Sequence, residues 1–199
     1  MKLGRDFFEN ASFDVARELL GCFVVHTTAS GKIVGRIVET EAYGDSTDLA
    51  SHARFGPTQR TKIMFGPAGH LYVYSIYGIF NLTNIICGPD GHPSAVLIRA
   101  TEIIEGQEAA KTNVSNSKFA KANDKIATGP GKLSLALGID RSHNGIDITN
   151  SDEIYILPRT ATDKFDVVST ARIGIEYSKH SKELPWRFYI RNNKFVSKK

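Results

Sequence analysis

Two glutamates and a tyrosine are spaced two residues apart in the stretch 31–43, GKIVGRIVETEAY. The stretch has a period of two, so Glu39, Glu41 and Tyr43 fall on one face of a predicted β-strand. Same-face neighbours lie about 6.6 Å apart along a strand, so two carboxylates there repel unless a cation, water or substrate lies between them. A desolvated carboxylate has a raised pKa, which suits a general base. The stretch predicts either such a base or the solvated end of an edge strand.

A second candidate for chemistry is Arg99, the one charged residue in the apolar run 95–101. The run 95–103 is predicted to be a strand, and an arginine inside such a strand is rarely left unpaired. Glu39 or Glu41 is the expected partner.

Tyrosines mark a predicted hairpin further along the chain. Tyr72 and Tyr74 share one face of the strand 71–76, and a second apolar strand covers 79–87. Tyr77 lies between the two strands, at the expected turn. A core or rim aromatic is the ordinary interpretation of Tyr72 and Tyr74, but it suits a tyrosine at a hairpin tip poorly.

The remaining elements must position these residues. Ser12 is predicted to cap a short helix, and the polar stretch 44–62, with His52, Arg54 and Arg60, is predicted to be a loop of the kind that carries binding residues. The basic, aromatic tail 187–199 is expected to be solvated beyond its first strand. The other predicted elements are helices at 12–21, from 105 into a loop ending near 125, and at 132–137, and strands at 22–27, 32–43, 154–157, 167–175 and 187–190, with a hairpin turn at 29–31.

The bulk properties bound the possibilities. A chain of 199 residues with 23% charged residues is expected to form one globular domain, 1–199, and its net charge of +4 is too small to establish nucleic-acid binding. Cys22 and Cys87 are expected to be small buried hydrophobes. The six histidines show no ligand spacing, so no metal site is predicted. With no apolar leader and no membrane-length run, a cytoplasmic location is expected.

Several motifs in order resemble the alkyladenine (3-methyladenine) DNA glycosylase family, bacterial type. They are RIVETEAY at 36–43, LYVYSIYG at 71–78, VLIRA at 96–100, GPGKLSLALGI at 129–139, ARIGI at 171–175 and LPWRFYIR at 184–191. The resemblance covers nearly the whole chain. It implies a single mixed α/β (α+β) domain on a curved, mostly antiparallel sheet with surrounding helices, from which a β-hairpin projects into DNA.

The resemblance also implies a reaction. Glu41 matches the general base that activates water for attack on the sugar C1′, and Arg99 matches the residue that holds this water and the carboxylate. No lysine occupies the nucleophile position, so the implied product is an abasic site without strand cleavage. The implied substrate is double-stranded DNA with alkylated purines, and the implied enzyme is a monomer without cofactor, metal, membrane or obligate protein partner.

Further positions match the family's base pocket. Tyr43, His52 and Tyr74 match the walls that receive a purine flipped out of the duplex, and Asn84 matches a residue that screens purines. Tyr77 matches the side chain that fills the gap in the duplex. Extruding a base costs a few kcal/mol, which aromatic stacking of about 1–3 kcal/mol per base could largely offset.

Two other function classes fit part of the sequence. A carbohydrate glycosidase could use Glu39 and Glu41 as its carboxylate pair, but their spacing on a strand lies between the usual retaining and inverting distances. A noncatalytic nucleic-acid binding module would explain the charge and the aromatics. It would not explain a carboxylate and Arg99 inside apolar strands.

Overall fold

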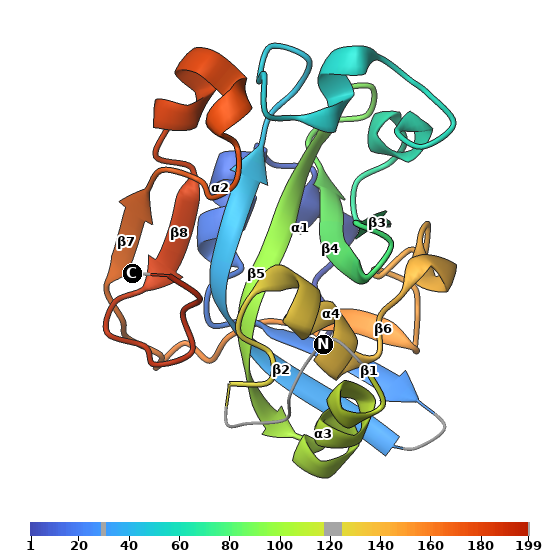
Figure 1. Cartoon of the computed structure of the whole chain (residues 1–199), viewed down its shortest axis with the longest axis vertical. Helices are drawn as coiled ribbons and strands as arrows, with labels where there is room; N and C mark the ends of the chain where they lie inside the picture. Colours follow the sequence, from blue (N-terminus) through green and yellow to red (C-terminus); the bar gives the residue numbers. More distant parts are fainter. Residues whose placement is uncertain (29–30, 118–124, 199) are drawn as a thin grey trace.

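The strand β2 (Gly31–Tyr43) organises the sheet in the computed structural model, which describes residues 1–28, 31–117 and 125–198. On one side β2 pairs along most of its length with β5 (Ser94–Glu105) (Figure 1). On the other side its first half pairs with β1 (Phe23–Thr28) and its second half with β8 (Arg187–Ile190). Strands therefore flank the glutamate-bearing end of β2 on both sides, and the alternative of a solvated edge strand is wrong.

The rest of the sheet is antiparallel throughout. Its order is β3-β4-β5-β2-β1-β6, and β8 carries β7 on its outer side. The remaining strands are β3 (Leu71–Ile76), β4 (Phe80–Cys87), β6 (Ile154–Leu157) and β7 (Val167–Thr170). The register between β2 and β5 shifts at three places, two of them next to Glu39, and such bulges bend a strand. The predicted α+β fold on a curved antiparallel sheet is confirmed.

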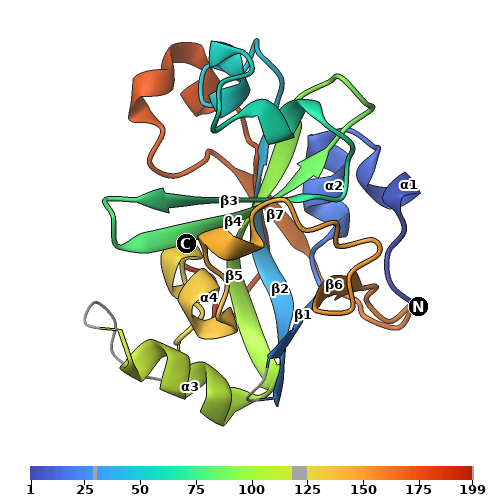
Figure 2. The same ribbon diagram turned by 90° about the vertical axis from the view of Figure 1, so that its right-hand side faces the viewer.

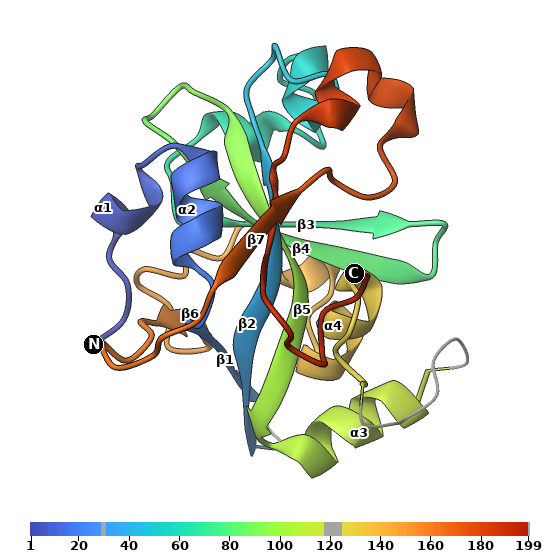
Figure 3. The same ribbon diagram turned by 90° about the vertical axis from the view of Figure 1, so that its left-hand side faces the viewer.

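Helices cover both faces of this sheet. Figure 3 shows α2 (Ser12–Glu18) on one side of β2 and β5, and α4 (Pro130–Leu137) on the other. Buried side chains on the sheet and on both helical layers form the main core, and a smaller second cluster includes Tyr72 and Ile86. The other helices are α1 (Arg5–Phe8), α3 (Gln107–Ser115) and the 3-10 helices η1 (His52–Phe55), η2 (Lys62–Phe65), η3 (Arg141–His143) and η4 (Glu176–Glu183).

The predicted hairpin is formed by β3 and β4. They pair from Leu71 opposite Ile85 to the last pair before the turn, and Figure 2 shows the two strands running out side by side to that turn. Tyr77 and Gly78 both have positive φ, 53° and 67°, and are the central residues of a tight turn that Ile79 closes by donating to the Ile76 carbonyl. The Tyr77 side chain is 90% exposed at the tip.

Three local expectations need correction. Ala11, not Ser12, is the N-cap of α2, and the buried Ser12 makes no capping bond; the helix ends at Glu18, before Gly21. The strand predicted over 167–175 stops at Thr170, because Arg172 leaves the sheet to bind Asp48.

The tail is the third correction: it is tied to the sheet, because Arg187 and Ser197 both bind Glu39. Positions 29–30 of the predicted hairpin turn, and 118–124 of the predicted mobile loop, lie outside the described residues. Both cysteines are buried and free, as expected. Among the described residues, no helix has the length and apolar character needed to cross a membrane.

Candidate active site

Arg99 joins the two glutamates of β2. It donates from Nε to Glu39 Oε1 at 3.0 Å and from Nη1 to Glu41 Oε2 at 3.1 Å. Both glutamates are 0% exposed. The cation expected between two same-face carboxylates is thus Arg99 itself, which pairs with both.

Glu41 has two further donors. The backbone N–H of Ile173 reaches Oε1 at 2.8 Å, and the Tyr43 hydroxyl reaches Oε2 at 2.9 Å. Burial nevertheless raises the pKa of Glu41 above its ordinary value, outweighing the lowering by Arg99, Ile173 and Tyr43. Glu41 is therefore a carboxylate fixed in position and receptive to a proton.

Glu39 is held differently. Arg187 Nη1 donates to its Oε1 at 2.8 Å, and Ser197 donates from its backbone N to Oε2 at 2.6 Å and from Oγ to Oε1 at 2.9 Å. With Arg99 Nε, four donors converge on this one carboxylate. Glu39 is therefore held in place by these donors and in turn fixes the position of Arg99.

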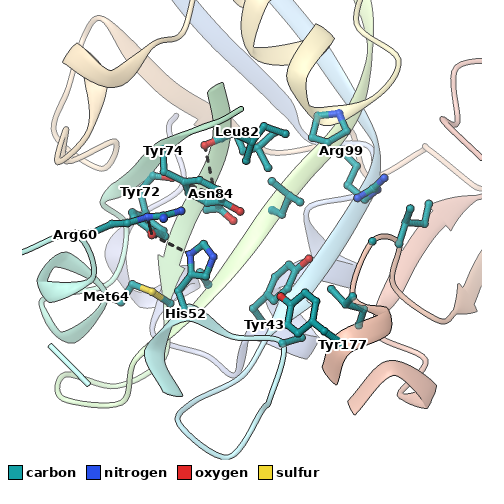
Figure 4. A pocket seen from close by; sticks show the side chains of 18 of the residues that line it. Tyr43, His52, Arg60, Met64, Tyr72, Tyr74, Leu82, Asn84, Arg99 and Tyr177 are labelled. Atoms are coloured by element: carbon teal, nitrogen blue, oxygen red, sulfur yellow. Dashed lines mark hydrogen bonds between the residues drawn. The ribbon is translucent and has the colours of Figure 1, made fainter. Parts of the chain in front are cut away.

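A pocket of about 370 Å³ opens beside this network. Figure 4 shows the rings of Tyr43 and Tyr177 on one side and those of His52, Tyr72 and Tyr74 on the other. Pockets of this size and aromatic character accept flat organic ligands. Of the residues predicted from sequence, the pocket lining includes Tyr43, His52, Tyr74, Tyr77, Asn84 and Arg99.

Glu41 is not among the residues that line the pocket. It lies directly behind them: three of its hydrogen-bond donors, Arg99, Tyr43 and Ile173, belong to the lining. Glu41 therefore contacts the pocket wall through these three groups.

His52 is held in one protonation state by its neighbours. Tyr72 Oη lies 2.9 Å from His52 Nδ1 and accepts from Arg60 Nε at 3.2 Å, so its hydroxyl proton is directed to the imidazole. Burial, followed by the charges of Arg60 and Arg54, lowers the pKa of His52 to about 4. His52 is accordingly neutral at physiological pH, with Nδ1 as the acceptor.

Asn84 lies on β4 at the pocket wall. Its amide nitrogen donates to the Tyr72 carbonyl at 3.2 Å and, more weakly, to that of Leu82 at 3.5 Å. These backbone bonds fix the orientation of an amide that also lines the pocket.

Some contributors carried no assigned role in the sequence prediction. Arg172, which binds Asp48 through two bonds of 2.6 and 2.8 Å, lies 4.8 Å from the centre of the Tyr43 ring and so backs the pocket. Arg60 lies 4.6 Å from the Tyr74 ring centre. Arg172 falls within the motif at 171–175 and Arg60 within the polar loop. Their places in the sequence were therefore only a weak indication that they belong to the site.

Comparison with known proteins agrees with this geometry. Residues 6–194 match the methylpurine-DNA glycosylase family. The chain belongs to that family. It is 45% identical to the protein named "Putative 3-methyladenine DNA glycosylase" of Methanocella arvoryzae, over 99% of this chain and 96% of that protein. It is 42% identical to proteins of the same name from Clostridium perfringens strain 13 and Carboxydothermus hydrogenoformans, over the full length of each.

Family membership identifies the class of enzyme. The protein is a DNA glycosylase of DNA repair, a hydrolase that acts on N-glycosidic bonds in DNA. The resemblance found in the motifs is thereby confirmed for the family, the enzyme class and the DNA substrate. The roles of the individual residues remain predictions.

Proposed function

We propose that the protein releases alkylated purines of the 3-methyladenine type from duplex DNA, using water activated by Glu41, and leaves an abasic site. The observation that carries this proposal is the buried Glu41, whose pKa is raised, directly behind an aromatic pocket large enough for a base. Membership of the methylpurine-DNA glycosylase family supplies the substrate class.

Recognition rests on the aromatic walls. Chemistry on a base requires its extrusion from the stack, which costs a few kcal/mol and least for damaged or mispaired bases. Stacking between Tyr43 and Tyr74, at about 1–3 kcal/mol per base, offsets much of this cost. Alkylation puts positive charge on the purine, and the electron-rich faces of tyrosines favour a cation.

Hydrolysis needs a base but, for a cationic purine, little acid. Glu41 takes a proton from the water that attacks C1′, while Arg99 holds the carboxylate and the water in line. The purine leaves with the electrons of the glycosidic bond, which neutralise its positive charge. None of the lining residues that the structure describes is a lysine, so the pocket offers no amine for a Schiff base.

Two pocket residues control how a base enters the pocket and which bases are accepted. Tyr77, exposed at the hairpin tip, fills the gap left by the flipped base and slows its return. Asn84, fixed by its backbone bonds, narrows the pocket against the 2-amino group of normal guanine. We also propose that the enzyme acts in the cytoplasm as a monomer without an obligate protein partner.

The alternatives explain less. A carbohydrate glycosidase needs two carboxylates free to flank a glycosidic bond, but Arg99 binds both glutamates and Glu39 has four donors. A noncatalytic binding module has no use for a buried carboxylate whose pKa is raised.

The test is a glycosylase assay on duplexes that each carry one lesion, among them 3-methyladenine, 7-methylguanine, ethenoadenine and hypoxanthine. Parent enzyme should release alkylated bases, and Glu41→Gln should lose about 10²–10⁴-fold in rate while still binding lesion DNA, because the amide keeps shape but accepts no proton. Borohydride should trap no covalent adduct. Release by Glu41→Gln at the parent rate, or a trapped adduct, would refute the mechanism.

A further inference from the structure

We propose a second site, outside the base pocket, that binds a divalent transition ion of the zinc type through His26, His143 and Glu153. His26 lies on β1, His143 at the end of η3, and Glu153 just before β6. One ligand atom from each lies within 4.8 Å of the other two. The set could not be found by spacing, because the fold brings together positions 26, 143 and 153.

The contacts within the cluster leave room for an ion. Glu153 Oε1 lies 3.7 Å from His26 Nε2 and 3.6 Å from His143 Nε2. Both separations exceed the usual length of a hydrogen bond. Ligands around a tetrahedral ion of this kind, bound at about 2.0–2.2 Å, are about 3.3–3.6 Å apart. The two glutamate–histidine separations nearly match this distance, and the ligand nitrogens of the two histidines, within 4.8 Å of each other, would have to approach it on binding.

The outer nitrogen of His26 fixes its tautomer. Its Nδ1 lies 2.6 Å from the carbonyl oxygen of Leu137, which can only accept, so Nδ1 carries the proton. The lone pair of Nε2 therefore points into the cluster. The side chain is 3% exposed, so this acceptor is buried.

His143 can adopt the same arrangement. Its Nδ1 lies 3.1 Å from Asp140 Oδ1, a carboxylate that accepts the Nδ1 proton when Nε2 binds an ion. Without an ion, Nδ1 can instead accept the Asp140 backbone N–H at 3.1 Å. Metal-binding histidines typically donate their other N–H to a carbonyl or carboxylate, and the two histidines here have one of each.

The ligand set favours a transition ion. Two imidazoles and one carboxylate suit zinc, whereas magnesium and calcium prefer all-oxygen sites. His143 is 12% and Glu153 52% exposed, so solvent can reach the site and supply a fourth ligand. None of the three residues lines the base pocket, so the ion would join β1, η3 and the start of β6 rather than take part in base release.

The test uses the full chain, freed of metal with a chelator and titrated with Zn²⁺ by calorimetry. Wild-type protein should bind one ion, and Co²⁺ should give the absorption of a low-symmetry four-coordinate site. At Zn²⁺ a hundredfold above the dissociation constant, the melting temperature should rise by about 5 °C or more. Base release should not change.

Three variants locate the site. Glu153→Gln removes a half-exposed ligand without disturbing the core. Loss of a group that merely hydrogen-bonds a metal ligand typically weakens metal binding roughly 10–100-fold, so loss of the ligand itself should weaken Zn²⁺ binding by at least as much. His143→Gln should do the same. The control His92→Gln changes an exposed histidine in another turn and should bind as wild type does.

The melting temperature of metal-free Glu153→Gln should match that of metal-free wild type, so weaker binding reports the lost ligand. If His143→Gln fails to fold, Glu153→Gln decides alone. Absence of Zn²⁺ binding by the wild type, or equal binding by wild type and Glu153→Gln, would overturn the proposal.

Discussion

Glu39 and Glu41 are equally buried on one strand, yet the groups that surround their carboxylates differ. Glu39 accepts from Arg99, Arg187 and Ser197, with three donors on Oε1 and one on Oε2. Glu41 shares Arg99, but burial outweighs its partners and raises its pKa. A group that must accept a proton during a reaction needs the second environment.

The raised pKa of Glu41 predicts the pH dependence of base release. Only ionised Glu41 can accept a proton, so the single-turnover rate on 3-methyladenine duplex should fall as pH drops through a pKa above the ordinary 4.5. Glu41→Gln should show no such fall. His52, with a pKa of about 4, is already neutral in that range, so His52→Gln should keep the acid limb. An acid limb lost in His52→Gln and kept in Glu41→Gln would contradict the assignment.

The same two environments predict losses of stability of different size. Removing the charge of Glu39 leaves Arg99 and Arg187 buried against a neutral amide, so Glu39→Gln should lower the free energy of unfolding by about 3–5 kcal/mol.

Glu41 has a folded-state pKa above its unfolded value, so its neutral form is the more stable one in the fold, and stability falls as pH rises through that pKa. Glu41→Gln should therefore cost much less at pH 7. Chemical denaturation of both variants measures this difference, and an equal or larger loss in Glu41→Gln would show that the two roles are reversed.

At the residue scale, the sequence predicted the features that depend on neighbouring residues. The period of two placed Glu39, Glu41 and Tyr43 on one face, and the apolar run around Arg99 called for a buried acidic partner. The other partners of Glu39 could not be predicted, because Arg187 and Ser197 are 148 and 158 positions away. The donor from Ile173 is a backbone N–H, which no residue type reveals.

At the scale of elements, the β3–β4 hairpin shows most clearly how the fold presents a side chain to a partner. Most of its two strands packs into the sheet or the pocket, while Tyr77 at the turn is almost fully exposed. An aromatic side chain held in solvent by a tight turn gains nothing for the fold. Its position suits a partner that brings its own apolar surface, such as a stack of bases.

Tyr77→Ala should therefore lower excision from duplex DNA and weaken binding to it, because the empty gap lets the base return to the stack. The variant should act normally on a free alkylated nucleoside, which has no stack to leave. Tyr77→Phe keeps the ring and should retain most duplex activity. Unchanged single-turnover rates of Tyr77→Ala on duplex would make Tyr77 a surface aromatic without a role.

Elements were predictable where pattern and turn chemistry agreed, as in β2, β3, β4 and β5. They failed where a single side chain redirects the backbone. The apolar spacing of 167–175 reads as one strand, but the bonds of Arg172 to Asp48 and to the Ala42 carbonyl turn the chain after β7 and bring Ile173 to Glu41. That departure from the pattern completes the site.

At the scale of the whole molecule, charge is divided between interior and surface. Three arginines, Arg99, Arg172 and Arg187, are buried against Glu39, Glu41 and Asp48. The three positive and three negative charges cancel when Glu41 is ionised, so the net charge of +4 belongs to the rest of the chain, where it can meet phosphates.

Binding to lesion duplex should consequently weaken with added salt. Each phosphate neutralised by a surface cation contributes about −0.9 to the slope of log affinity against log salt concentration, so contact with three or more phosphates gives a slope steeper than about −2.5. Fluorescence anisotropy of a labelled duplex, repeated over a series of salt concentrations, measures this slope.

A free alkylated nucleoside carries no phosphate, so its inhibition constant should stay nearly constant over the same series. Because the buried ion pairs are shielded from salt, the melting temperature should change little, which separates loss of DNA contacts from loss of fold. A flat response of duplex binding, with the fold intact, would mean that the surface charge does not contact the DNA backbone and that recognition depends on the pocket alone.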